Sequence, residues 1–326
     1  MSFAALSRRE LLKAIAVAPL TGPFAGERDA APSQRPTASS RLQVGIMSRH
    51  LQWTTAEEAI EVAKTAGFET IEWTVRPGGH IPPERVAREL PRVVELTRKA
   101  GLSVPIITTA IQDASSPYAE AILAAAKEAG VQFYRCGQYF RYDYTKPIAP
   151  QIDALKPRIA SLVPLNQKYG LTWLYHTHSG TGNIGGNVWD IWGAVKEFDP
   201  AYVALNYDVG HTTIRGGNGW EEAARVAMTH IRGVGIKDPR WQRSGDGRWT
   251  PEFVPIGEGM ADLTARFSVF KSGGFSGPVI VYFEHHNLLG TDVGTWTLPM
   301  PKAEFIAIIK QDLDRLRDSM RAAGAI

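Results

Sequence analysis

The chain has 326 residues, of which 44% are hydrophobic, and carries a formal net charge of +3 at pH 7. Because this charge is small and the basic residues are scattered, the composition argues against a nucleic-acid partner. The one cysteine, Cys136, excludes an internal disulfide and a cysteine metal cluster, and we expect it to be buried in a strand.

The N-terminal segment has the features of an export signal. Residues 7–13 resemble the twin-arginine pattern, and the apolar run after them, residues 14–20, is too short to span a bilayer. We expect residues 1–41 to be a twin-arginine-type signal peptide with a flexible linker, which predicts a periplasmic or secreted protein without stable membrane insertion. The alternative is a disordered basic tail.

From residue 42 onward, strand-like and helix-like patterns alternate in eight pairs. The predicted strands are residues 42–47, 70–75, 103–108, 131–135, 171–175, 201–207, 231–236 and 278–283. The predicted helices are residues 55–66, 83–100, 118–129, 152–169, 188–198, 220–229, 261–271 and 302–322. Continuous apolar strands and glycines after helices favour a parallel sheet covered by helices. Eight such units predict one domain, residues 42–326, folded as an α/β protein of the (β/α)8 TIM-barrel class.

Two loops of this barrel are expected to matter for function. Residues 212–219 are predicted to be a glycine-rich loop, and residues 238–259 a long loop that folds over the barrel mouth as a lid. The chain has no dinucleotide-binding glycine motif after its first strand and no P-loop. The usual sequence signals for binding a phosphate group are therefore missing from the chain.

Ionisable residues gather where the predicted strands end, which is where TIM barrels carry their active sites. Asp208 and His211 stand three residues apart after strand six, a spacing that suits a divalent metal or a proton in transfer. Each has a structural alternative, and Asp208 could instead cap a helix or turn. Glu72 could pair with Arg76, whereas Arg135 is expected to be a buried charge with an acidic partner or a substrate contact.

Three motifs at the ends of the last three strands resemble the xylose-isomerase-like TIM-barrel superfamily of sugar isomerases and epimerases. They are residues 207–211, 236–238 and 282–285, and residues 175–181 are similar to a segment of inosose dehydratases. The resemblance implies one divalent metal, bound by a Glu, an Asp, a His and a Glu after strands five to eight. The chain departs from this pattern twice, with Gly235 in place of the histidine and His176 in place of the first glutamate.

The two departures leave the ligand set open. His176 and His178 alternate along a strand, so we expect only one of them to point inward and to replace the missing imidazole. The predicted metal ligands are Asp208, Glu284 and His178, and a mixed nitrogen and oxygen set favours Mn, Co or Zn over Mg. The predicted catalytic residues are Glu284, His211 and Lys237. The predicted substrate-binding residues are Glu72, Arg135, His176 and Trp249.

Together with this resemblance, these residues predict an enzyme that removes a proton next to a metal-bound carbonyl of a keto-sugar. Return of the proton makes it a sugar isomerase or epimerase. The lack of a phosphate-binding motif favours a neutral or uronic sugar over a sugar phosphate. The alternative is a metal-dependent lyase or dehydratase that eliminates a substituent from a keto-sugar or a 3-keto-glycoside. A second alternative is a non-catalytic periplasmic sugar-binding protein, against which the crowded carboxylates argue. A homo-oligomer is left open.

Overall fold

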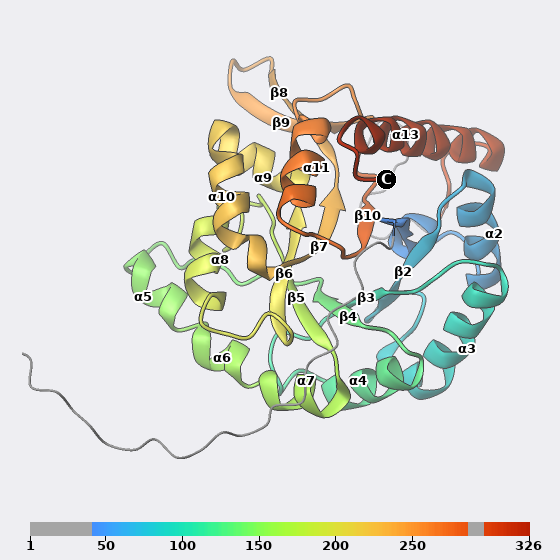
Figure 1. The fold of residues 1–326 in the computed structure, drawn as a ribbon, viewed down its shortest axis with the longest axis horizontal. Coiled ribbons are helices and arrows are strands. Elements are labelled where there is room, and N and C mark those ends of the chain that lie inside the picture. The colour runs from blue at the N-terminus through green and yellow to red at the C-terminus, as the bar shows by residue number, and fades with distance from the viewer. Residues whose placement is uncertain (1–40, 286–296) are drawn as a thin grey trace, which may run out of the picture. The chain divides into compact units, whose positions relative to one another are not determined.

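The computed structural model describes residues 41–285 and 297–326. The predicted signal and linker therefore lie outside the described residues, except for Arg41. Residues 40–326 form one compact unit, in which eight parallel strands close into a barrel with the helices around it (Figure 1). The predicted (β/α)8 TIM barrel is thus confirmed.

The barrel strands pair in chain order, and the last one closes the ring beside the first. They are β1 (Val44–Met47), β2 (Thr70–Val75), β3 (Ile106–Thr109), β4 (Phe133–Cys136), β5 (Thr172–His176), β6 (Val203–Asp208), β7 (Ile231–Ile236) and β10 (Val279–Val281). Because every pairing is parallel, all carboxyl ends lie at one end of the barrel. We call this end the mouth.

The helices lie outside the barrel and mostly match the predicted ones. They include α2 (Ala56–Ala66), α3 (Val86–Lys99), α4 (Ala119–Glu128), α8 (Val188–Val195), α10 (Trp220–Ala227), α11 (Leu263–Ser272) and α13 (Lys302–Ala322). Local sequence sets their ends: Thr55 and Glu58 form a capping box before α2, and Gly67 ends it with a φ of 94°.

The predicted helix at residues 152–169 is instead three short helices. These are α5 (Ile148–Asp153), α6 (Lys156–Ala160) and α7 (Val163–Tyr169). Pro157 and Pro164 stand in the first turns of α6 and α7. Proline has no backbone N–H and is tolerated there but not inside a continuous helix, so each proline marks a new start.

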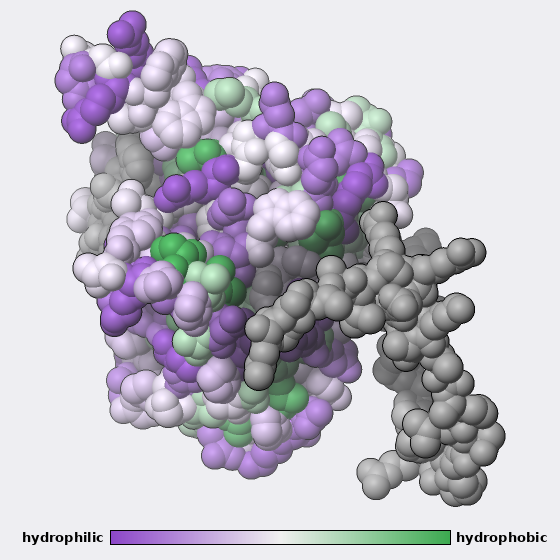
Figure 2. Space-filling view, turned by 90° about the vertical axis from the view of Figure 1, so that its left-hand side faces the viewer, coloured by the Kyte–Doolittle hydropathy of each residue, from purple (hydrophilic) through white to green (hydrophobic). Residues whose placement is uncertain are grey.

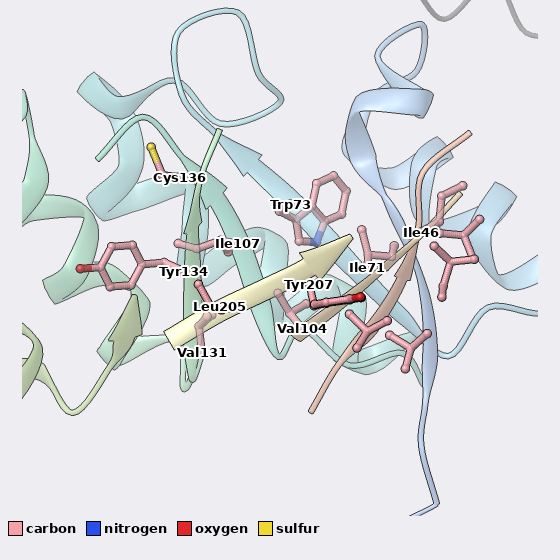
Figure 3. Close-up of a cluster of buried hydrophobic side chains, with 14 of the residues drawn as sticks. Ile46, Ile71, Trp73, Val104, Ile107, Val131, Tyr134, Cys136, Leu205 and Tyr207 are labelled. Atoms are coloured by element: carbon pink, nitrogen blue, oxygen red, sulfur yellow. The ribbon is translucent and has the colours of Figure 1, made fainter. Parts of the chain in front are cut away.

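Two apolar layers hold the barrel together. Inward-facing side chains form a small core inside it, made of Met47, Ile106, Leu174, Ala204, Ile280 and Tyr282. Outward-facing ones pack under the helices, and Figure 3 shows part of this layer, including Ile71, Trp73 and Leu205. Cys136 is buried and free in the outer layer, as predicted. Each fully buried side chain of this size contributes about 1.5–3 kcal/mol, so the layers dominate the stability.

Two segments near the mouth differ from their predictions. The predicted loop at residues 212–219 is largely α9 (Val209–Gly216), which begins directly after β6 because the Asp208 side chain caps it. The predicted lid loop contains an antiparallel hairpin of β8 (Asp238–Arg243) and β9 (Trp249–Val254). Asp238 pairs with Val254 at the base of the hairpin, and Arg243 pairs with Trp249 at its far end.

The surface is that of a helical shell in contact with water. On the face drawn in Figure 2, hydrophilic side chains predominate and hydrophobic ones lie singly or in small groups. None of the helices in the described part of the chain has the length and apolarity needed to cross a membrane.

Candidate active site at the barrel mouth

Lys237 lies at the centre of a polar cluster in the mouth. Its Nζ is 2.6 Å from Nε2 of His211, 2.8 Å from Oε1 of Glu284 and 3.5 Å from Oδ2 of Asp208. These residues come from three neighbouring strands, since Asp208 ends β6, Lys237 follows β7 and Glu284 follows β10. The structure therefore brings together the three residues predicted to be catalytic.

The surroundings fix the protonation of two members of this cluster. Burial lowers the pKa of His211 well below its usual range, and the charge of Lys237 lowers it further, so the imidazole is neutral. Burial would raise the pKa of Glu284, but the charge and hydrogen bond of Lys237 lower it to about 2. At neutral pH the cluster thus pairs a carboxylate, an ammonium and a neutral imidazole, which can take up, carry and return a proton.

Asp208 has both of the roles that its sequence position allowed. Its Oδ1 accepts a hydrogen bond of 2.9 Å from the backbone N–H of His211 and caps α9. Its Oδ2 is buried without a hydrogen-bond partner in the described structure, and burial raises the pKa of the carboxyl group to about 6. Lys237 Nζ and His176 Nε2 lie 3.5 and 3.6 Å from this oxygen, so it can still accept a closer cation or a substrate hydroxyl.

A possible metal site lies next to Lys237. Donor atoms of His176, Asp208 and His211 all lie within 4.8 Å of one another, and all three residues are buried. Burial also lowers the pKa of His176 well below its usual range, so both imidazoles are neutral, as metal ligands must be. The donors therefore fit a metal such as Zn or Co. Lys237, however, contacts two of the same residues.

The three-residue cluster contains His176, whereas the sequence analysis placed His178 and Glu284 among the ligands. Nδ1 of His178 accepts hydrogen bonds from the Gly180 backbone, 3.0 Å away, and the Asn183 amide, 3.1 Å away. The expectation that only one of the two histidines points inward also differs from the structure. Residues two positions apart in an extended segment point to the same side, and both rings lie beside His211 at centroid distances of 6.0 and 3.8 Å.

Glu72 and Arg135, predicted to bind substrate, form a buried ion pair inside the barrel. Glu72 also accepts hydrogen bonds from Thr108 and from the Tyr282 hydroxyl. The partner of Glu72 is thus Arg135 and not Arg76, because β2 and β4 direct their side chains into the same interior. With its carboxylate fully engaged, Glu72 supports the floor of the site.

Asn206, which the sequence analysis did not single out, links this floor to the metal cluster. Its Nδ2 donates to Nδ1 of His176 at 2.8 Å and to the Tyr282 hydroxyl at 3.1 Å. With Nδ1 as acceptor, the proton of the neutral His176 ring is on Nε2. If the Asn206 amide turns over, its unpartnered Oδ1 faces Nδ1 and Nε2 becomes free to bind a metal. Only the three-dimensional pairing of β5 with β6 reveals this role.

Aromatic side chains complete the mouth, although Trp249 is not among them. Trp249 is 64% exposed at the far end of the hairpin. Phe253, near the base, instead lies 5.1 Å from Nζ of Lys237 and 5.4 Å from the His211 ring centroid.

Gly235 stands where the family pattern has a histidine after strand seven. A Cβ added to Gly235 would lie 2.5 Å from the Tyr282 ring. The Tyr282 ring therefore fills the space that a strand-seven histidine would need.

Comparisons with known proteins agree with this architecture. Residues 60–319 match the family model described as "Xylose isomerase-like TIM barrel", whereas no curated protein sequence matches the chain. L-ribulose 3-epimerase is similar in structure, with 17% identity and a TM-score of 0.62 over 87% of this chain and 97% of that one. Two further similar structures show the same fold at equally low identity. The 3-keto-D-glucoside 4-epimerase YcjR from E. coli has 16% identity and a TM-score of 0.61, with 85% and 100% coverage of the two chains. The IOLI protein with a bound zinc atom has 16% identity and a TM-score of 0.61, with 87% and 98% coverage.

Proposed function

The chain belongs to the xylose isomerase-like TIM barrel family, and on this premise we propose that it is a divalent-metal-dependent sugar isomerase or epimerase. The substrate is a keto-sugar, and the reaction begins with removal of a proton from the carbon next to the carbonyl. The observation that carries this proposal is the contact of Lys237 with Glu284 and His211, 2.8 and 2.6 Å away. A base, a cation and a neutral imidazole meet there in a mouth lined by barrel strands.

Each residue of the cluster has a chemical role in this proposal. The Glu284 carboxylate takes the proton from carbon, and the electron pair of the broken C–H bond moves onto the carbonyl oxygen. The Lys237 ammonium stabilises the resulting oxyanion and can donate a proton to it. His211 accepts a hydrogen bond from Lys237 and holds the ammonium group in place. Return of the Glu284 proton to the neighbouring carbon, while the neutral Lys237 amine takes the proton of that carbon's hydroxyl group, completes isomerisation. Epimerisation requires a second acid to protonate the original carbon on the opposite face, since return of the proton from the Glu284 side restores the substrate.

The metal in this proposal is held by His176, Asp208 and His211. A divalent ion there supplies a Lewis acid that polarises the carbonyl and spreads the charge of the enediolate. Lys237 contacts His211 and Asp208, two of the three residues that would hold the metal, so a bound ion would compete with Lys237 for them, whereas Glu284 lies outside this set of three.

A lyase is the second candidate, and one observation favours it. Among the described carboxylates of the mouth, Glu72 is paired with Arg135 and Asp208 both caps α9 and belongs to the possible metal site, so Glu284, paired with Lys237, is left as the base. Its neighbour Lys237 lies on the same side. Such a pair can remove a proton from carbon and protonate the β-oxygen that leaves, so a keto-sugar would lose water or an alcohol.

Solvent exchange tests the proposal directly. The purified protein is loaded with Mn²⁺, Co²⁺ or Zn²⁺, its metal content is measured, and a panel of keto-sugars is incubated with it in D₂O. We expect deuterium at the carbon next to the carbonyl, detected by NMR, and an isomeric product; an unsaturated product would identify the lyase instead. Glu284→Gln should lower the exchange rate by about 10²–10⁴-fold while the metal content stays. Binding of sugars without any exchange would support the sugar-binding protein.

We also propose that the protein is exported through the twin-arginine route, on the basis of Arg8 and Arg9 in the N-terminal segment. Cell fractionation tests this, since replacing both arginines by lysine should retain the protein in the cytoplasm. An unchanged distribution would favour a simple basic tail.

A further inference from the structure

Two arginines at the mouth have no role in the reaction described above. Arg49 follows β1 and Arg76 follows β2, and both are half-buried. Within the part of the chain that the structure describes, neither guanidinium has a carboxylate within 4.0 Å or a hydrogen-bond acceptor. The nearest candidate for Arg76, Glu72, is already occupied by Arg135, Thr108 and Tyr282.

The barrel places these arginines next to the catalytic cluster. Around the mouth, β6, β7, β10, β1 and β2 are consecutive neighbours, so Arg49 and Arg76 continue the row that Asp208, Lys237 and Glu284 begin. The charges of Arg49 and Lys237 both act on the His50 imidazole. The charge of Arg135 acts on both Asp208 and Arg76. The five side chains therefore share one concave end of the barrel.

The fold makes room for Arg76 to reach across the mouth. An added Cβ on Gly137, directly after β4, would lie 2.6 Å from Nη1 of Arg76. The same position is 3.1 Å from Thr108 and 3.2 Å from the Thr109 carbonyl, so the guanidinium extends over the ends of β3 and β4. A residue other than glycine at position 137 would displace it.

This arrangement costs free energy unless an anion is present. Burial, together with the charges of Arg49 and Arg135, lowers the pKa of Arg76 to about 10. Four cationic side chains, Arg49, Arg76, Arg135 and Lys237, thus face three carboxylates, Glu72, Asp208 and Glu284. A half-buried guanidinium without a partner binds an anion strongly, because its planar fork matches a carboxylate with two parallel hydrogen bonds.

We propose that Arg49 and Arg76 bind a carboxylate group of the substrate, so that the substrate is a sugar acid of the uronate or keto-uronate class. This inference rests on the proposed function and names its substrate. The carboxylate at one side of the mouth holds the sugar so that its carbonyl end lies beside Lys237 and Glu284. A phosphate is disfavoured because phosphate sites draw on backbone N–H groups at helix starts. The turn before α3 offers few of these, since it begins with Pro82 and Pro83.

Calorimetric titration of the metal-loaded protein tests the binding step. The probes are D-glucuronate and D-galacturonate, the neutral sugars D-glucose and D-galactose, and D-glucose 6-phosphate. We expect the uronates to bind at least about tenfold more tightly than the neutral sugars, because hydrogen bonds between charged groups are stronger than those between neutral groups. Equal affinity for uronates and neutral sugars would overturn the inference, and so would a preference for the phosphate.

Variants of the two arginines test whether the carboxylate is bound by a planar guanidinium group or by positive charge alone. Arg76→Met should lower the ratio of uronate to neutral-sugar affinity by about tenfold or more, and Arg76→Lys should restore only part of it. Arg49→Met should act in the same direction. The control is Arg232→Met, which removes an exposed arginine at the start of β7, the opposite end of the barrel. An unchanged ratio in both mouth variants would overturn the inference.

Deuterium exchange distinguishes this inference from the proposed function. Exchange in neutral keto-sugars but not in keto-uronates would support the proposed isomerase function and contradict the proposal that the substrate is a sugar acid. Uronate binding that depends on Arg76, without exchange in any sugar, would refute the isomerase and support the carboxylate site. Exchange in keto-uronates that Arg76→Met abolishes would support both.

Discussion

Lys237 contacts two of the three residues that would hold a metal ion, and this competition makes a prediction at the scale of one residue. Lys237 lies 2.6 Å from Nε2 of His211 and 3.5 Å from Oδ2 of Asp208. Lys237→Met removes a positive charge from the site while keeping the length of the side chain. We expect Zn²⁺ or Co²⁺ to bind at least about tenfold more tightly, since like charges at this distance repel strongly, and the exchange rate to fall. Competition with a chelating dye measures the affinity; weaker metal binding would show that Lys237 supports the site and does not compete for it.

Variants of Asn206 and Asn183 can decide whether His176 or His178 binds the metal. Asn206 contacts Nδ1 of His176 at 2.8 Å, and Asn183 contacts Nδ1 of His178 at 3.1 Å. Residues that orient a ligating histidine typically change metal affinity by about 10–100-fold when mutated. Asn206→Leu should therefore weaken metal binding, whereas Asn183→Leu should have a smaller effect. The reverse order would make His178 the ligand, as the sequence analysis expected.

At the scale of the element, the hairpin of β8 and β9 brings one end of its second strand to the site. Phe253 contacts Lys237 and His211 near the hairpin base, and Trp249 lies four residues away, which is about 13 Å along a strand. Phe253→Ala should lower the exchange rate by about tenfold by letting water reach the Lys237 ammonium. Trp249→Ala should have a clearly smaller effect. The same NMR assay measures both, and a larger loss in the Trp249 variant would place substrate at the hairpin tip.

Sequence patterns predicted the elements better than the contacts between them. The bounds of β2, β7 and α13 agree with the prediction because apolar runs and the prolines and glycines beside them define these segments locally. The helix α9 was missed because Gly210 and its neighbouring threonines disfavour a helix, and the Asp208 cap that starts it also has the position of a metal ligand.

For the site, strand order brought Lys237, Glu284 and His211 together in the prediction as in the structure. The pairing of Glu72 with Arg135 joins residues 63 positions apart and depends on which strands share the barrel interior. Spacing along the chain carries no signal for such a contact. Spacing along the chain also gives no signal for Asn206, because its role depends on the His176 ring that the pairing of β5 with β6 places beside it.

At the scale of the whole molecule, the fold keeps most of its histidines neutral. Six of the eight histidines of the chain have a lowered pKa, and burial is the largest cause for each: His50, His80, His176, His178, His211 and His230. They lie in the barrel mouth, under the loop after β2 and between α8 and the barrel. An unfolded chain would leave them free to take up protons near pH 6.5.

This difference predicts that the metal-free protein loses stability as the pH falls from about 6.5 to 4. The pKa of His50 is lowered to about 3 and that of His80 to about 4. In this window the unfolded state binds more protons than the folded state, so the free energy of unfolding decreases by up to about 1.4 kcal/mol per pH unit for each such histidine. Three aspartates act in the opposite direction, because burial raises the pKa of Asp208 to about 6 and also raises those of Asp190 and Asp238. They offset only part of the effect of six histidines. Urea unfolding at pH 7, 5.5 and 4.5, after treatment with a chelator, measures the trend. His50→Gln should make the dependence shallower; a midpoint that stays constant down to pH 4.5 would show that the histidines are already protonated in the folded protein.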